Sequence, residues 1–90
     1  MKFLIRVSIP TTQGNEMVKD SNFKNMEDYI KSTNAESAYF TVYEGDRTAI
    51  FIIDVTSADQ MSRVCEPLFI LGGKVHWNMV MTLDDLKKGL

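Results

Sequence analysis

Residues 38–55, AYFTVYEGDRTAIFIIDV, decide the fold of this chain of 90 residues. Between Ala38 and Tyr43, successive side chains fall into two alternating sets, and a period of two is typical of a β-strand. A second β-rich run extends from Thr48 to Val55. The connection Glu44–Arg47 is short and contains a glycine, which is the pattern of a hairpin. The stretch therefore predicts two strands that pair with each other.

Two further segments repeat the alternation of a strand. Residues 2–9, KFLIRVSI, have a period of two, and Pro10 closes the run because proline has no N–H to donate to a sheet. Residues Lys74 to Met81 alternate in the same way near the other end of the chain. The sequence thus predicts four strands in all.

A helix is predicted between the first strand and the hairpin. Residues 11–15 supply turn and N-cap chemistry, and the helix fades at residues 32–34. Its first turns, around residues 17–22, are less regular than the rest. Spacings of three and four produce one apolar stripe, with Tyr29 at its edge. The stripe consists of Phe23, Met26 and Ile30.

Two more helices are predicted after the hairpin. Ser57 is a good N-cap for the first of them, and Gly72–Gly73 ends it. Pro67 clashes with the carbonyl of Arg63, so we expect this helix to kink or restart near Glu66. Thr82 caps a short terminal helix over residues 83–88. The apolar stripe of the longer helix consists of Met61, Val64, Cys65 and Leu68.

The order strand-helix-strand, strand-helix-strand predicts an α+β fold of the ferredoxin-like βαββαβ type. We expect one domain over residues 1–90, with a four-stranded antiparallel sheet in the order 4-1-3-2 and a short C-terminal helix. Right-handed crossovers place both main helices on one face of that sheet.

Composition and charge exclude several classes of partner. Twelve acidic residues outnumber ten Lys and Arg, so the positive footprint needed for nucleic acid is missing. The first apolar stretch is broken by Arg6, too early for a signal peptide, and no stretch approaches the roughly 20 residues of a membrane span. The lone Cys65 excludes an intrachain disulfide, and no Cys/His cluster has zinc spacing. We expect a cytoplasmic protein without metal or cofactor.

The two faces of the predicted sheet differ in character. The strictly apolar parity of each strand is expected to face the helices, and its members are Phe3, Ile5, Val7, Phe40, Val42, Phe51, Ile53, Val55, Val75, Trp77 and Met79. The opposite face is too apolar for a solvated surface and too polar for a dry core. A second copy of the sheet is the economical cover, so the sequence predicts a homodimer through this face. The members of this face are Leu4, Arg6, Ser8, Tyr39, Thr41, Tyr43, Ile50, Ile52, Asp54, His76, Asn78 and Val80.

Short motifs along almost the whole chain resemble those of a family of small, uncharacterised bacterial proteins. The motifs are Gly14-Asn15-Glu16, Ala35-Glu36 to Tyr39-Phe40, Gly45 with Arg47-Thr48, Glu66-Pro67-Leu68-Phe69, and Val80-Met81-Thr82 with Asp84-Asp85-Leu86. That family belongs to the dimeric α+β barrel group of ferredoxin-like folds. The resemblance implies a dimeric barrel. It leaves the chemistry open, because the wider group includes cofactor-independent monooxygenases, muconolactone isomerase, haem enzymes and ligand-sensing modules.

Charged residues on the predicted dimer face have two readings each. Arg6 and Asp54 lie on adjacent strands, where they either form an ion pair that closes the dimer or leave the arginine to bind a carboxylate. His76, the only histidine, is either a structural residue or a general acid or base near neutral pH. Haem ligation by His76 is disfavoured, because nothing else in the sequence fits a haem site.

Polar side chains beside them are candidates for a pocket lining. Tyr39, Thr41, Tyr43 and Asn78 offer hydroxyl and amide groups that can orient an aromatic substrate. Tyrosines on a half-covered strand also serve for packing. The candidate ligand-binding set is therefore Arg6, Tyr39, Thr41, Asp54, His76 and Asn78.

Three functions are compatible with this set. The first is a homodimer that binds a small apolar or aromatic molecule between its sheets. The second is a cofactor-independent monooxygenase or isomerase that uses His76, Arg6, Asp54 and Tyr39 around the same cavity. The third is a non-catalytic interaction module whose inter-sheet space is filled by side chains.

Overall fold

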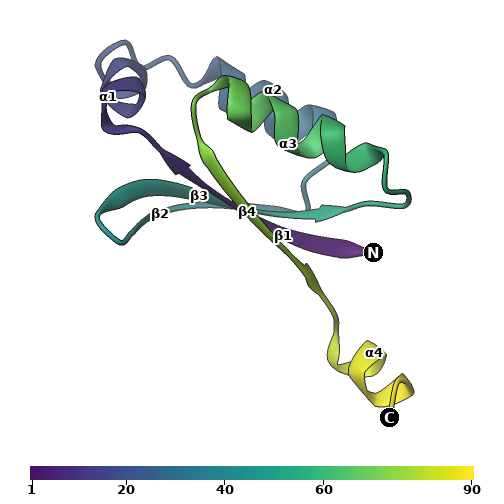
Figure 1. The fold of residues 1–90 in the computed structure, drawn as a ribbon. Coiled ribbons are helices and arrows are strands. Elements are labelled where there is room, and N and C mark those ends of the chain that lie inside the picture. Colours follow the sequence, from purple (N-terminus) through teal and green to yellow (C-terminus); the bar gives the residue numbers. More distant parts are fainter.

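A computed structural model describes all 90 residues as four strands and four helices (Figure 1). None of the helices is both long and apolar enough to cross a membrane. In chain order the elements are β1 (Lys2–Ile9), α1 (Thr11–Lys19), α2 (Lys24–Thr33), β2 (Ser37–Tyr43), β3 (Asp46–Asp54), α3 (Gln60–Ile70), β4 (Lys74–Val80) and α4 (Leu83–Lys88).

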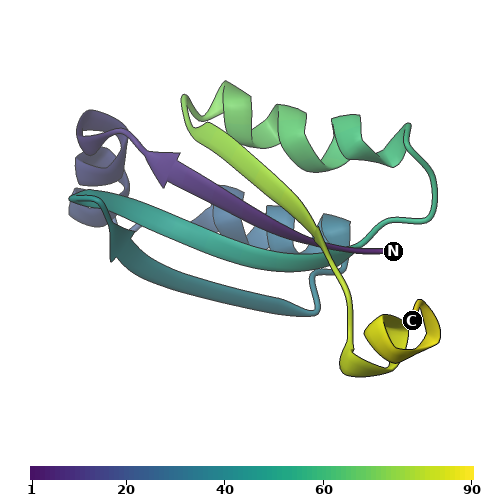
Figure 2. The ribbon, with the colours of Figure 1, turned by 60° about the horizontal axis from the view of Figure 1, so that its bottom comes forward.

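The strands form a single antiparallel sheet in the order β2-β3-β1-β4. Counted from the β4 edge, the order is 4-1-3-2. Helices α2 and α3 lie side by side over one face of this sheet, and α1 lies near the end where β1 stops (Figures 1 and 2). The α+β prediction with a four-stranded antiparallel sheet is confirmed, and the arrangement is ferredoxin-like.

The core lies between the two central strands and the pair α2–α3. Cross-strand register places Ile5 between Phe51 and Trp77, so one parity of each strand points toward the helices. In β1 and β3 this parity is buried, as predicted. The buried apolar residues are Phe3, Ile5, Val7, Ile9, Met26, Tyr29, Ala49, Phe51, Ile53, Val55, Val64 and Leu68.

The core prediction is wrong for four residues of the edge strands. Phe40 and Val42 in β2, and Trp77 and Met79 in β4, have the helix-facing parity but are each more than half exposed. An edge strand has a neighbouring strand on one side alone, so water reaches its side chains from the other side. Trp77 still contacts the core, because its ring packs edge-on against Phe3 with 5.4 Å between centroids.

The single helix predicted before the hairpin is in fact two. Helix α1 ends at residue 19, and α2 begins at Lys24. Ser21 adopts a left-handed backbone conformation with φ 49°, and the N–H of Asn22 donates to the carbonyl of Met17, which together form a Schellman-type helix end. The side chain of Asn22 then accepts from the N–H of Lys24. Turn-forming side chains therefore break the helix where its apolar stripe was weakest.

Helix α3 also departs from its prediction. It begins at Gln60, because the carbonyls of residues 57–59 accept hydrogen bonds in tight turns and Ser57 makes no side-chain cap. The helix does not restart near Glu66, because α3 continues as one helix through Pro67 to Ile70. Arg63, whose carbonyl loses its helical donor to this proline, lies at the exposed side of α3, where water can supply the missing bond.

Tyr29 joins the two helices that cover the sheet. Predicted at the edge of the stripe, it is instead buried, and its hydroxyl donates to the carbonyl of Val64 in α3 at 2.7 Å. Its ring lies 4.9 Å from that of Phe51, centroid to centroid. Burial raises the pKa of Tyr29 well above its ordinary value of 10.0. The phenol therefore stays neutral and hydrogen-bonded in the folded protein.

We expect Tyr29→Phe to lower the free energy of unfolding by about 1–2 kcal/mol, because a buried carbonyl loses one donor. Below pH 10 the neutral phenol contributes fully to stability. Above it, the unfolded chain ionises first, so the wild type loses stability with rising pH more steeply than the variant. Urea denaturation at pH 7 and across pH 9–11 measures both effects. Tyr39→Phe, at an exposed residue, is the control, and an equal effect from it contradicts this role for Tyr29.

Gly73 lies where α3 is followed closely by β4. A Cβ atom at this position would lie 2.3 Å from the Cγ2 of Val7 and 3.1 Å from the carbonyl oxygen of Leu68. Val7 is in the core, so it has little room to move. The end of α3 at Gly72–Gly73, predicted from the sequence, thus also serves the packing of β1.

The variant Gly73→Ala is expected to lose about 1–3 kcal/mol of stability through overpacking. Gly89→Ala is the matched control, because a Cβ there meets nothing closer than 3.7 Å. Thermal unfolding of both variants measures this difference as a lower melting temperature for Gly73→Ala than for Gly89→Ala. Equal melting temperatures for the two would show that the contact with Val7 relaxes freely.

Candidate functional site

The face of the sheet that carries no helix is called the open face here. Its centre is apolar: Leu4 in β1 and Ile50 and Ile52 in β3 are half-buried among their strand neighbours. Tyr39 is more exposed, at the β2 edge. The predicted residues of this face do share it, because they have one parity in the observed register.

Arg6 is the charged residue at the middle of the open face. Its cross-strand neighbours are Ile50 in β3 and His76 in β4, and Tyr39 lies opposite Ile50. Three of the six candidate residues therefore form one row across the sheet. Thr41 and Asn78 lie in the rows on either side of it, where Thr41 faces Thr48 and Asn78 faces Leu4.

The guanidinium of Arg6 lacks a carboxylate partner. Its central carbon stacks 4.2 Å from the ring centroid of Tyr43, a cation–π contact. Its Nε atom is buried and has no hydrogen-bond acceptor. A buried N–H without an acceptor costs free energy, and no carboxylate of the chain pairs with this guanidinium to offset that cost.

Arg6 and Asp54 do not form an ion pair within one chain. Asp54 lies opposite Lys2, which precedes Arg6 by four residues in β1. This spacing separates Asp54 from the row of Arg6 by about 13 Å along the strand. Its Oδ1 instead accepts a 3.0 Å hydrogen bond from the N-terminal ammonium. That bond and charge lower the pKa of Asp54 below its ordinary value. Asp54 therefore belongs to the other end of the sheet from Arg6.

A polar hollow surrounds Arg6 and is called the Arg6 hollow below. Its volume is about 380 Å³. Sequence reasoning missed its two acidic residues and its lysine, because the loop after Tyr43 read only as a charged hairpin and Lys74 only as the start of a strand. The lining consists of Arg6, Ser8, Tyr43, Glu44, Asp46, Lys74 and His76.

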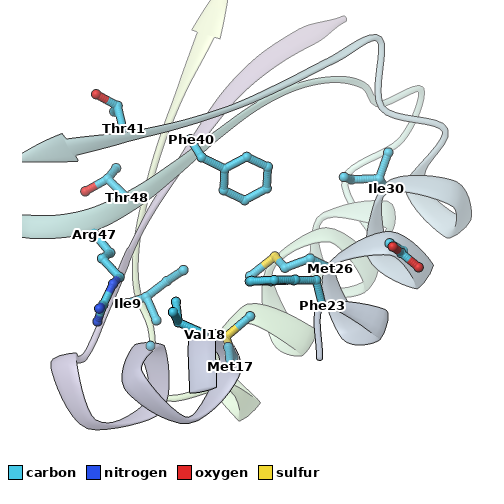
Figure 3. Close-up of a pocket in the computed structure, with 12 residues that line it drawn as sticks. Ile9, Met17, Val18, Phe23, Met26, Ile30, Phe40, Thr41, Arg47 and Thr48 are labelled. Carbon is cyan, nitrogen blue, oxygen red and sulfur yellow. The ribbon is translucent and has the colours of Figure 1, made fainter. Parts of the chain in front are cut away.

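A second hollow, absent from the predictions, lies at the opposite side of the sheet between α1, α2 and the β2–β3 hairpin (Figure 3). Its volume is about 430 Å³, and its surface is almost wholly apolar. Residues of α1, of α2 and of the segment between them line it. The sequence predicted one continuous helix in this region, so it gave no indication of this hollow. We call it the apolar groove. Its lining consists of Ile9, Gly14, Met17, Val18, Phe23, Met26, Glu27, Ile30, Phe40, Thr41, Arg47 and Thr48.

Arg47 lies at one side of the apolar groove, beside α1. Its Nη1 donates to the carbonyl of Thr11 at 3.4 Å, and a Cβ at Gly14 would come within 2.7 Å of the same nitrogen. Helix α1 therefore packs closely on the Arg47 side chain at this glycine, and a larger residue at position 14 would make the arginine shift. The groove thus offers an apolar floor with one cation, and Glu27 among its lining residues supplies an anion.

Cys65 is not a site for nucleophilic chemistry. It is half-buried on α3, and burial raises the pKa of its thiol. The thiolate is the reactive form, so the raised pKa disfavours reaction.

Comparison with known proteins leaves the family open. No family model matches the chain, and no curated protein matches it. Among solved structures, it is similar to one described as "De novo designed protein Ferredog-Diesel", with a TM-score of 0.48 and 12% identity over 87% of this chain and 82% of that one.

Proposed function

We propose that this protein is a homodimer of the dimeric α+β barrel type, which holds a small aromatic or apolar molecule with an anionic group between its two open faces. The observation that carries the proposal is Arg6, a half-buried cation without an ion pair in the chain, beside the apolar centre of the open face.

The dimer follows from the apolar centre of the open face. Leu4, Ile50 and Ile52 are adjacent across β1 and β3, and no helix of the chain covers them. Contiguous apolar patches on a monomer commonly mark an interface. Two-fold symmetry lets the same patch cover itself, so a second copy removes both patches from water at once.

The ligand follows from the charge of Arg6. Pairing two open faces would take the guanidinium further out of water, and a buried charge is tolerated only when it is paired. A carboxylate or sulfonate supplies the missing charge and acceptors in one group. Tyr43 already stacks on the guanidinium of Arg6. Ile50 and Tyr39, which lie in the same cross-strand row as Arg6, supply surface for the aromatic or apolar part of the ligand.

Binding is favoured over catalysis by the surroundings of His76. A general base needs a second group to fix its tautomer and orientation. The side chain of His76 is exposed and makes no such hydrogen bond within the chain. The alternative function is a cofactor-independent monooxygenase or isomerase. In that case the partner subunit or the substrate would have to orient His76. An interaction module with a filled inter-sheet space is the other alternative.

The dimer is tested by placing a charge in the proposed interface. Ile52→Lys puts an ammonium between Leu4 and Ser37 on the open face, where pairing of sheets would bury it. We expect the wild type to elute as a dimer and this variant as a monomer in size-exclusion chromatography with light scattering. Val42→Lys, on the exposed side chain of the opposite parity, is the control and stays dimeric. A monomeric wild type overturns the proposal.

The ligand is tested with 2-naphthoate and its neutral analogue 2-naphthalenemethanol in equilibrium dialysis. We expect the carboxylate to bind more tightly, and Arg6→Met to weaken its binding about tenfold or more, because a charge-assisted hydrogen bond is worth about 1.5–3 kcal/mol. Arg47→Met, in the apolar groove, is the control and leaves binding unchanged. The reverse result, with sensitivity to Arg47 alone, would move the ligand to the groove and contradict the assignment to Arg6.

A further inference from the structure

Helix α4 has no place in the core of its own chain. None of its residues is buried: Leu83 and Leu86 are 65% and 47% exposed, and Leu90, just after the helix, is 98% exposed. The helix is nevertheless well formed, because Thr82 and Asp85 make a reciprocal capping box. A helix of six residues is too short to be stable without packing. Its leucines therefore require a surface outside the chain.

Figure 1 shows where that surface must lie. Helix α4, in yellow, projects beyond the end of β4 on the side of the sheet away from α2 and α3, and Figure 2 gives the same arrangement. This is the side of the open face. A second copy docked on the open face would therefore come within reach of α4.

We infer that α4 of each copy closes over the Arg6 hollow of the other copy. The inference rests on the proposed open-face dimer and adds which segment of the second copy completes the site. Its physical basis is the match of α4 with that hollow in position, charge and length.

Two limiting orientations of the dimer axis place α4 at different ends of the partner's sheet. The axis that relates two sheets packed face to face lies in the plane between them. If it runs along the strands, both α4 helices meet the end that contains Lys2 and Asp54. These charges are already paired, Lys2 with Glu36 at 2.8 Å and Asp54 with the terminal ammonium. If the axis runs across the strands, each α4 meets the partner's other end, which contains the Arg6 hollow.

Charge favours the second case. The first turn of α4 contains Asp84 and Asp85, and its last turn contains Lys87 and Lys88. The Arg6 hollow has the opposite arrangement: Lys74 lies on β4 at one side, and Glu44 and Asp46 lie at the hairpin on the other side. Acidic and basic ends of α4 thus both find opposite charges.

Length agrees with this placement. Six helical residues span about 9 Å. Strands β3 and β4 are separated by β1, so they lie two strand spacings, about 10 Å, apart. Leu86, between the charged ends, and Leu83, just before them, would then cover the ring of Tyr43 and the stem of Arg6. The site for an anionic ligand becomes complete only when the partner supplies its α4.

A charge exchange between Lys74 and Asp84 tests the contact. Within one chain these residues lie at and beyond opposite ends of β4, about 20 Å apart or more, so any coupling between them is intermolecular. We expect Lys74→Asp and Asp84→Lys each to weaken the dimer several-fold in sedimentation equilibrium, and the double variant to recover within about twofold of the wild type. Asp20→Lys, at the end of α1, is the control for net charge.

The apolar part of the contact has a separate test. Leu83→Ser combined with Leu86→Ser should weaken the dimer about tenfold or more and reduce 2-naphthoate binding, with an unchanged circular dichroism spectrum of the monomer. Both side chains are exposed in the single chain, so folding does not depend on them.

The outcomes separate this inference from the proposed function. A dimer that Ile52→Lys breaks, but that neither the charge exchange nor the leucine variant affects, overturns the role of α4 and leaves the open-face dimer intact. A monomeric wild type overturns both. Single charge reversals that add their effects in the double variant, without recovery, also overturn the pairing of α4 with the hollow.

Discussion

The structure depends on one constraint: a sheet has two faces, and this chain has helices for only one of them. Burial of β1 and β3 beneath α2 and α3 removes Ile5, Phe51 and Ile53 almost completely from water. The hydroxyl of Tyr29 then ties the two helices to each other through the carbonyl of Val64. No helix of the chain covers the other face of the sheet. Tyr39 is therefore exposed at the β2 edge, and Arg6 lies on a face that only a second molecule can cover.

The sequence predicted correctly which strand residues share a face of the sheet, but it did not predict which residues lie opposite each other on neighbouring strands. Period-two alternation assigns each strand residue to a face, and that assignment holds in all four strands. It does not assign register. The hairpin turn sets the register of β2 on β3, but that of β1 on β3 depends on the packing of two helices between them in sequence. Arg6 and Asp54 do not pair within one chain for this reason, since they share a face yet lie four cross-strand pairs apart.

Breaks in helices were the second source of error. One predicted interruption is absent, and one break that was not predicted is present. Pro67 was expected to interrupt α3, but the helix continues through it, and water can supply the hydrogen bond that the carbonyl of the exposed Arg63 loses. The run from Asp20 to Phe23 contains no proline, yet it ends one helix and starts another through Ser21 and Asn22. The apolar groove exists because of this second break. A hollow that depends on a local turn is therefore beyond the reach of hydrophobic periodicity alone.

Strand β2 is the outermost strand on one side, and its free edge has a consequence for solubility during folding. Residues 38–43 form a run without charge, proline or glycine, rich in aromatic and β-branched side chains, and the unpaired N–H and C=O groups of such an edge can template the addition of a foreign strand. Glu44 and Asp46 follow immediately, and their negative charges oppose the stacking of identical chains in register. The acidic turn of the hairpin thereby also acts as a gatekeeper against cross-β aggregation.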